Sequence, residues 1–508
     1  MVFRLAFLSY LVILSDSLFV HCHPWSHRGA TILNSRDDAK DAYDYVIVLE
    51  SGKYSVLVIE YGYSDYDTGS PFFDITSQPS PELNNRTFPV LIGSIVGGSS
   101  AVNGMVFQRD ISSDYDIWGE LSGVAESTWN WENLLGYFRK AVQLVTPPPA
   151  DLAATYNMML HDPSVLIMYE AMKAIPGVTV PVDGAGGENG MFWATRSMDP
   201  MTFERSYAKT GHWDGLSRKN YELVTGTKVN KVVFKGNRAV GVYMSPRVNG
   251  TQAEDRSEKG KKGRSKTRII KARKEVILAA GSIHTPQILQ LSGIGLASLL
   301  EEGTHSREGR FAGRRCKLPR SSIPPDPHLP LDHCPTNPDR QRLIPDRERL
   351  PLRLGARHLL RPPRNLARQP RPIADRYAAQ DPAQHLPAGT HPSVIAGYAK
   401  QQRIYAREMR RTGLTWFGAG LAGSETVSCT PQNLHPVSRG TVTIDLEDPA
   451  GREPIVDYRG AANPVDIDIF VEDTKSWRRY VSSGMLAQYN ATEIEPGPGY
   501  ETDEALRG

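Results

Sequence analysis

Only six residues, Leu49 to Tyr54, separate two runs of β-forming residues near the start of the chain. The first run, Tyr43 to Val48, is apolar enough for a strand buried on both faces, and the second, Ser55 to Glu60, ends in an acid. Adjacent parallel strands normally need a crossover of about a dozen residues or more, usually a glycine-rich turn and a helix. The two runs therefore predict a nucleotide-binding sheet that lacks its phosphate loop.

The same two runs also fit a second interpretation. A β-hairpin that turns around Ser51-Gly52 would leave Glu60 as a solvated strand end. In a nucleotide-binding sheet, by contrast, a carboxylate at the end of the second strand accepts hydrogen bonds from ribose hydroxyls. These residues alone leave both interpretations open, because short buried runs are ambiguous.

Composition limits the class of protein but not its function. The chain has 508 residues, 40% of them hydrophobic, which is enough for two or three domains with substantial cores. Its formal net charge of +3 is nearly neutral for this length, so we expect no nucleic-acid partner. Cys316, Cys334 and Cys429 show no paired C-x-x-C spacing, and we expect no metal site.

The N-terminus has the features of a secretory signal peptide, which we place at residues 1–22. Arg4 precedes an apolar stretch from Leu5 to Leu14 that is too short to span a membrane. No later segment approaches the roughly 20 apolar residues that a transmembrane helix needs. Three glycosylation sequons, which begin at Asn85, Asn249 and Asn490, agree with a secreted glycoprotein or one of the endomembrane lumen.

Glycine and serine are concentrated between Gly97 and Phe107, in the sequence GGSSAVNGMVF. Glycine permits positive φ and close approach of the backbone, and the amides beside Ser99 and Ser100 can form an anion-binding nest. A tight turn before a helix would explain the same residues. The run is therefore either a ligand-binding loop or an ordinary turn.

Four segments together resemble the glucose-methanol-choline (GMC) oxidoreductases, which are FAD-dependent flavoproteins. They are Ala42 to Val48, Val56 to Glu60, Gly97 to Arg109, and Ala279 to Gly295. The last two are similar to the two signature motifs of the family, in the same order and at a matching separation. Two long motifs in register are far more specific than a lone glycine-rich motif.

The resemblance implies which residues bind FAD. They are Glu60, Tyr61, Gly98, Ser99, Asn103, Gly104, Met105, Val106 and Val229. Glu60 would hold the ribose of the adenosine, and Asn103 to Val106 would line the flavin and the pyrophosphate. Val229 would meet the adenine through its backbone, although an ordinary core residue of a strand would look the same.

The implied fold is α/β, with a Rossmann-like FAD-binding domain and an interleaved α+β substrate domain built on an antiparallel sheet. We place the FAD-binding domain at 40–110 and 215–300, and the substrate domain at 111–214 and 373–500. Three short runs, Tyr221 to Thr225, Val229 to Phe234 and Ala239 to Met244, are typical of a β-meander. In the family such a meander rises from the FAD-binding domain.

The segment 304–372 departs from the family pattern. Between Phe311 and Pro372 it is rich in proline and arginine, and Phe311 is its only aromatic residue. Such a composition buries too little apolar surface to offset the entropy of ordering, so we expect no regular structure. The family pattern returns near Ile373. Together with the missing loop at Leu49, this break indicates an imperfect gene model or a decayed gene.

We assign no catalytic residue. The family's catalytic histidine would follow the equivalent of Thr502 to Leu506, and this sequence ends at Gly508. His435 precedes a proline, as in the catalytic motif, but it matches a sheet-entry segment and we interpret it as structural. We expect His284 and His212 to be structural or exposed.

The implied function is FAD-dependent oxidation of an alcohol group on a small organic molecule, with oxygen or another acceptor receiving the electrons. Sugars, aryl alcohols and intermediates of secondary metabolism are the substrate classes that the resemblance implies for a secreted chain. Two alternatives stay open. One is a flavin-retaining cyclase of the same fold that performs no redox reaction, and the other is a catalytically inactive relic.

Overall fold

The computed structural model describes residues 31–507 apart from several gaps, the longer of which are 47–53, 142–162, 248–266, 306–356 and 361–369. The signal peptide predicted at 1–22 and the sequons at Asn249 and Asn490 lie outside the described residues. Across the described part, no helix has the length and apolar character that crossing a membrane requires.

A seven-stranded sheet contains most of the strands in the first 280 residues. In spatial order its strands are β1 (Thr31–Leu33), β7 (Tyr221–Val224), β3 (Val56–Ile59), β2 (Ala42–Val46), β10 (Arg268–Val276), β9 (Arg238–Pro246) and β8 (Thr227–Lys235). Neighbouring strands from β1 to β10 in this order are parallel to one another, whereas β9 is antiparallel to both β10 and β8. This mostly parallel sheet confirms the predicted α/β class.

The parallel pairing of β2 with β3 shows that the hairpin interpretation around Ser51-Gly52 is wrong. Only two residue pairs are in register, Tyr45 with Val56 and Val46 with Leu57. Strand β3 therefore begins beside the end of β2. The end of β2 and the start of β3 are separated by about the distance between neighbouring strands, which a short connection can span. Parallel neighbours normally need about a dozen connecting residues, and from this rule we expected six to be too few. The rule does not hold here because β2 and β3 overlap at only two residue pairs.

The predicted β-meander is also corrected in its first strand. Strand β7 lies between β1 and β3 in the parallel part of the sheet, not beside β8. The antiparallel meander consists of β8, β9 and β10 instead. Turn residues between two runs indicate a reversal of the chain, but they do not decide which strands pair.

A second, antiparallel sheet has the order β13 (Val427–Asn433), β12 (Trp416–Ala422), β11 (Arg357–Leu360) and β5 (Phe192–Trp193). Two short pairs complete the described strands, β14 (Thr441–Thr443) with β15 (Ile455–Asp457) and β4 (Val106–Phe107) with β6 (Thr195–Arg196). Strand β11 falls within 304–372, where we expected no regular structure. That expectation is wrong for β11 because its partners β12 and β5 come from distant parts of the chain.

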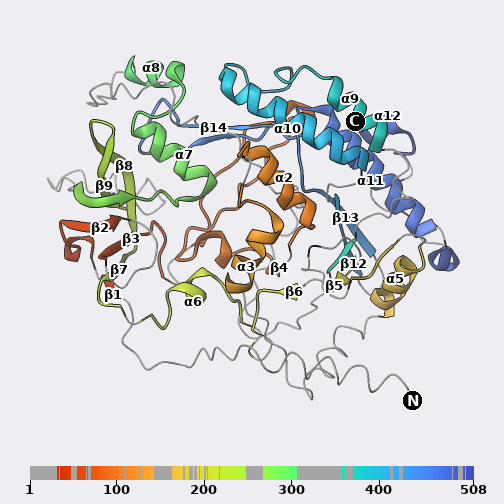
Figure 1. Ribbon diagram of the computed structural model, residues 1–508, viewed down its shortest axis with the longest axis horizontal. Helices are drawn as coiled ribbons and strands as arrows, with labels where there is room; N and C mark the ends of the chain where they lie inside the picture. Colours follow the sequence, from red (N-terminus) through yellow and green to blue (C-terminus); the bar gives the residue numbers. More distant parts are fainter. Residues whose placement is uncertain are drawn as a thin grey trace.

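Helices surround these sheets (Figure 1). The α-helices are α2 (Ser112–Ser122), α3 (Trp131–Ala141), α5 (Pro163–Lys173), α6 (Ala208–His212), α7 (Gly281–Leu291), α8 (Ala297–His305), α9 (Pro370–Ala379), α10 (Pro392–Arg411), α11 (Pro464–Ser482) and α12 (Asp503–Arg507). Short 3-10 helices are η1 (Arg36–Asp38), η3 (Pro81–Leu83), η4 (Gly98–Ala101) and η6 (Gly484–Tyr489). Helices α9, α10 and α11 lie together, away from strands β2, β3 and β7 (Figure 1).

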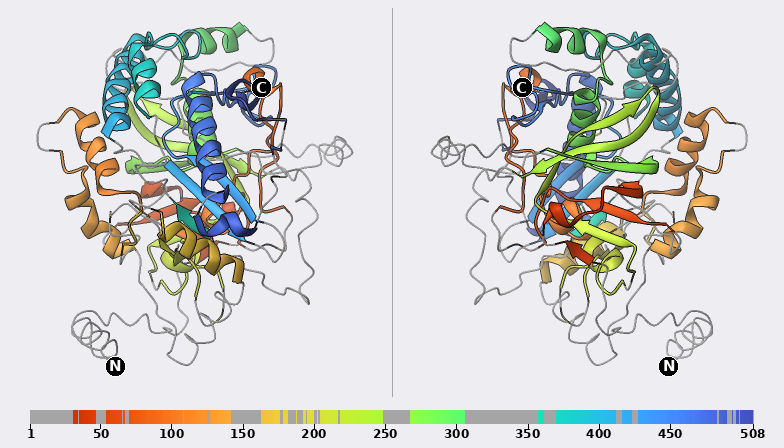
Figure 2. Two further views of the ribbon diagram at one scale, coloured as in Figure 1. Left: turned by 90° about the vertical axis from the view of Figure 1, so that its right-hand side faces the viewer. Right: turned by 90° about the vertical axis from the view of Figure 1, so that its left-hand side faces the viewer.

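Among the described residues, two of the five hydrophobic core clusters illustrate how these parts are built. In the first, β2, β3, β9 and β10 contribute buried side chains such as Tyr43, Leu57 and Ile270. In the second, Tyr377 and Met409 pack between α9, α10 and α11, and α11 also lies against β13 (Figure 2). The start of α11 is well defined, since proline occupies its first position and the Asn463 side chain accepts a hydrogen bond from the second residue of the helix.

Candidate functional site

Glu60 directly follows β3, at the carboxyl end of the parallel strands where nucleotide folds bind their ligands. Its carboxylate accepts a hydrogen bond of 2.7 Å from the backbone N–H of Gly62. Burial raises the pKa of Glu60 to about 7, while this hydrogen bond and the charge of Arg247 oppose the rise. The carboxyl therefore changes its charge close to neutral pH.

Tyr61 and Tyr63 both stack on the same cation. The guanidinium of Arg247, just after β9, lies 4.6 Å from the ring centroid of Tyr61 and 5.1 Å from that of Tyr63. The backbone N–H of Arg247 donates to the carbonyl of Gly226 at 2.8 Å. Arg247 is thus fixed by backbone and side chain, and it places a positive charge beside Glu60.

An aromatic column extends from Tyr61 to the second signature. The Tyr61 ring stacks on Phe73 with a centroid distance of 5.1 Å, and Phe73 lies 4.1 Å from the ring of His284. His284 in α7 is held in turn by Glu453, whose Oε2 lies 2.8 Å from Nε2. The column connects the segment after β3, α7 and the loop before β15, which are distant in sequence.

The glycine-rich run forms a tight loop around η4. Gly97 and Gly98 have φ values of 97° and 55°, which L-residues rarely adopt. The Ser99 hydroxyl accepts a hydrogen bond from the Gly93 N–H at 3.1 Å, and the Ser100 hydroxyl donates to the Gly97 carbonyl at 2.5 Å. The two serine side chains therefore stabilise the loop itself, while a Cβ added at Gly98 would meet nothing within 4 Å.

The next four predicted residues, Asn103 to Val106, form the C-terminal end of this loop. The Asn103 Oδ1 accepts hydrogen bonds from the Met105 N–H at 3.0 Å and from the Arg205 guanidinium at 2.6 Å. Met105 has a φ of 59°, and Val106 begins β4. Asn103 and Gly104 are exposed. Arg205 fixes the asparagine in place, a contact that the sequence analysis did not anticipate.

The segment after Glu60 lies directly beside the segment that leads into the glycine-rich loop. Tyr63 and Ile95 form a parallel bridge, and the Val96 N–H donates to the Tyr63 carbonyl at 3.0 Å. At Gly62 the backbones approach so closely that a Cβ would overlap the backbone of Ile95. The structure therefore brings the predicted ribose-binding acid and the glycine-rich run onto adjacent segments.

Val229 lies near the same place. It is in β8 opposite Met244, and its partly buried side chain packs against the core cluster that includes Val46 and Ile59. The backbone N–H of Thr227, where β8 begins, donates to the carbonyl of Glu60 at 3.1 Å. The start of β8 is therefore adjacent to Glu60, and contact of Val229 with an adenine stays a prediction.

Comparison with known proteins decides the family. The family model for GMC oxidoreductases matches residues 29–307, more than half of the chain. This chain belongs to the GMC oxidoreductase family. It is an oxidoreductase, and its cofactor is FAD.

Relatives and solved structures agree with this assignment. The GMC chain is 32% identical to "Dehydrogenase xptC" of Emericella nidulans over 543 residues, which cover 94% of this chain and 83% of the relative. It superimposes on a fungal aryl-alcohol oxidase with a TM-score of 0.70 at 26% identity, covering 92% of this chain and 87% of that one. An FAD-dependent oxidoreductase from Chaetomium thermophilum gives a TM-score of 0.72 at 26% identity, with coverage of 91% and 86%.

The residues of the GMC chain fit a flat group that lies over the glycine-rich loop. A Cβ at Gly98 would meet nothing within 4 Å, and Asn103 and Gly104 are exposed, so a flat group could approach the loop. Arg205 and Arg247 are the two supporting residues that sequence reasoning missed. Each resembles an ordinary surface cation in its local sequence, and only the folded chain places it beside a predicted site residue.

The histidines of the GMC chain differ in their surroundings. His435, on the loop after β13, has its Nε2 3.3 Å from Oδ1 of the buried Asp114 in α2, and the ring of Tyr405 packs edge-on against it. His212 is exposed at the end of α6, and His284 belongs to the aromatic column. A structural role for His435, which joins its loop to α2, stays our prediction.

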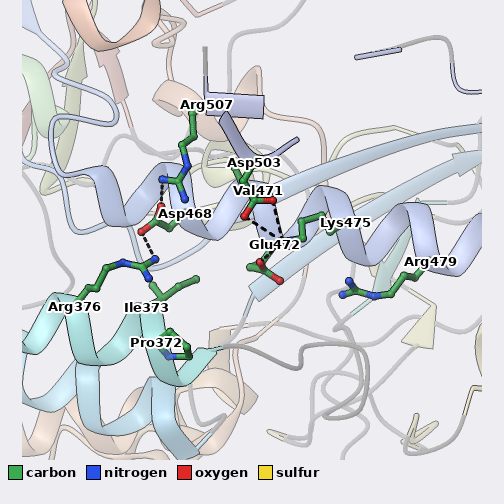
Figure 3. A pocket seen from close by; sticks show the side chains of 10 residues that line it. All are labelled: Pro372, Ile373, Arg376, Asp468, Val471, Glu472, Lys475, Arg479, Asp503 and Arg507. Carbon is green, nitrogen blue, oxygen red and sulfur yellow. Dashed lines mark hydrogen bonds and ion pairs between the residues drawn. The ribbon is translucent and has the colours of Figure 1, made fainter. Parts of the chain in front are cut away.

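A cavity of about 400 Å³ lies elsewhere, between α9, α11 and α12 (Figure 3). Asp468, which lines it, accepts hydrogen bonds from both Arg376 and Arg507, and Lys475 pairs with Glu472 and Asp503. None of the predicted FAD-binding residues lines this cavity. Its charges are used in docking the helices to one another, so we do not place the active site there.

Proposed function

We propose that this enzyme oxidises an alcohol group on a small organic molecule to a carbonyl group, and that aryl alcohols are the first class to test. The substrate loses two electrons and two protons, and bound FAD supplies the two-electron acceptor. Oxygen or another acceptor then takes up the electrons. The aryl-alcohol oxidase among the similar structures supports this substrate class.

One observation carries the proposal: the segment after Glu60 runs beside the segment that leads into the glycine-rich loop, with Gly62 against Ile95. An FAD molecule held by the ribose at Glu60 would extend toward the loop that carries Asn103. The proposed cofactor contacts are Glu60, Tyr61, Gly98, Ser99, Asn103, Gly104, Met105, Val106 and Val229. In this proposal Glu60 accepts ribose hydrogen bonds, and the loop backbone lies against the flavin and pyrophosphate.

Flavin reduction under anaerobic conditions tests the proposed reaction. We expect the visible absorption bands of FAD bound to the purified chain to bleach when a primary aryl alcohol is added. The matching carboxylic acid, which has no hydride to give, serves as the control ligand. Bands that persist while the substrate is converted would favour the non-redox cyclase instead. A chain that binds FAD but converts no candidate would favour the inactive relic.

The titration of Glu60 predicts how FAD binding depends on pH. The charged carboxylate accepts ribose hydrogen bonds through both oxygens, whereas protonation turns one of them into an O–H donor, so we expect FAD to bind the charged form. Because the pKa of Glu60 is about 7, we expect FAD affinity to fall about tenfold as the pH is lowered from 8 to 6. Isothermal titration calorimetry at several pH values measures this change. Glu60→Gln should bind more weakly and show no midpoint near pH 7.

Substitutions of Arg247 test the same pH dependence of FAD binding in a second way. The positive charge of Arg247 lowers the pKa of Glu60, so Arg247→Leu should move the midpoint of FAD binding to higher pH. Arg247→Lys keeps the charge and should leave the midpoint nearly in place. A pH profile that is identical in all these variants and the unmodified chain would contradict the role of Glu60 in holding the cofactor.

We further propose that the chain enters the secretory pathway and acts outside the cell or in the endomembrane lumen. The predicted signal peptide at 1–22 supports this route. A role in secondary metabolism is the corresponding proposal for its biological setting. Fusion of residues 1–22 to a reporter protein, followed by assay of the culture medium, tests the signal directly.

A further inference from the structure

One of the three sequons, Asn85-Arg86-Thr87, lies at the tip of a long excursion from the sheet. The two arms of this excursion are joined by antiparallel bridges from Phe72 to Gly93, from Thr76 to Pro89 and from Ser80 to Arg86. The 3-10 helix η3 forms the turn at its end. The sequon therefore lies at the turn of a defined excursion whose arms contribute buried Ile75 and Val90 to a hydrophobic cluster.

The backbone at the tip turns sharply. Asn84 and Asn85 have φ values of 57° and 56°, and the Asn85 N–H donates to the Ser80 carbonyl at 2.9 Å. These bonds use the backbone of Asn85 only. Among the described residues its carboxamide makes no hydrogen bond, and both Asn85 and Thr87 are exposed. The two side chains that define the sequon are thus accessible on the folded protein.

Residues other than Asn85 and Thr87 make the contacts that hold the tip against the rest of the protein. Ser80 is buried, and its hydroxyl donates to the Gly460 carbonyl at 3.4 Å. The side chain of Leu83 packs close to Gly460 as well. A bulky group on Asn85 would therefore displace none of the contacts that fix the excursion against the segment after β15.

We propose that Asn85 carries an N-linked glycan. In this reaction the Asn85 amide nitrogen forms a bond to the anomeric carbon of an oligosaccharide carried on a lipid diphosphate. The bond between sugar and phosphate breaks, the lipid diphosphate leaves, and the amide loses one proton. The threonine two residues later is part of the acceptor motif. This proposal does not depend on the oxidation that we propose for the enzyme.

Translation of the full chain in the presence of endoplasmic reticulum microsomes tests the proposal. Residues 1–22 are replaced by a proven secretory leader, and Asn249→Gln and Asn490→Gln remove the other two sequons. A short C-terminal tag with its own sequon, analysed as a separate glycopeptide, identifies the chains that entered the lumen. We expect these chains to carry a glycan on the Asn85 peptide that peptide N-glycosidase removes.

Matched variants locate the glycan on that peptide. Asn85→Gln and Thr87→Ala should abolish it, whereas Thr87→Ser should keep it. Asn84→Gln is the closest control, because Asn84 is exposed and has almost the same backbone conformation but begins no sequon. An unmodified Asn85 peptide in chains whose tag is glycosylated would overturn the proposal, as would a glycan that survives Thr87→Ala.

Discussion

Insertion of about a dozen residues with a G-x-G-x-x-G core between Val48 and Ser55 is expected to strengthen FAD binding at least about a hundredfold. The pyrophosphate of a dinucleotide is normally held by backbone N–H groups at the N-terminus of a helix. Ser51-Gly52 is too short to provide such a helix. Each recovered hydrogen bond to a charged oxygen contributes about 1.5–3 kcal/mol, so two of them account for the expected gain.

The insertion site is compatible with the sheet. Val46 lies at the carboxyl end of β2, the kind of strand end after which nucleotide folds place the glycine-rich turn, and Val56 begins the parallel neighbour β3. FAD fluorescence titration compares the unmodified chain with the insertion variant. An insertion of equal length with alanine at the three glycine positions is the control. Equally tight binding by the unmodified chain would show that the loop is not required.

Gly62→Ala is expected to destabilise the protein by about 3 kcal/mol and to weaken FAD binding at the same time. A Cβ at this position would overlap the backbone of Ser94 and Ile95, and backbone atoms move aside much less easily than a flexible side chain. The substitution would push the Glu60 segment away from the glycine-rich loop. Urea denaturation measures the loss of stability, and FAD titration of the folded variant measures the loss of affinity.

Gly136→Ala provides the matched control for this substitution. Gly136 is exposed in the middle of α3, and a Cβ there would meet nothing within 4 Å. Alanine favours a helix over glycine by up to about 1 kcal/mol, so this variant should be neutral or slightly more stable. If Gly62→Ala were as stable as Gly136→Ala, the close approach of the two segments would not exist as described.

The sequence predicted the class of the sheet well but not its register. The apolar run from Tyr43 to Val48 and the run from Ser55 to Glu60 indicated neighbouring strands of a nucleotide-binding sheet. Their stagger, with Tyr45 opposite Val56, depends on how the whole sheet packs. The same reason explains the misplaced strand β7, since its local pattern of apolar residues does not specify β1 and β3 as partners.

The residues that support the candidate site could not be predicted from the local sequence. Arg247 stacks on Tyr61 because the residue after β9 bonds to Gly226, whose own N–H donates to the Gly62 carbonyl. Arg205 reaches Asn103 from a separate segment. The strand β11 is a similar case, because its pairing partners are distant in sequence and outweigh a local composition that disfavours order. The motif residues could be named in advance, whereas the residues that position them could not.

Equilibrium dialysis of the purified full chain against FAD is the most direct test of the central claim that this chain is an FAD-dependent oxidoreductase. We expect excess flavin on the protein side, with a visible spectrum altered by binding, and we expect Glu60→Gln to lower the excess. Dialysis also detects weak binding, so the short connection between β2 and β3 does not prevent the measurement. Equal flavin concentrations on both sides of the membrane, with folded protein present, would contradict the account.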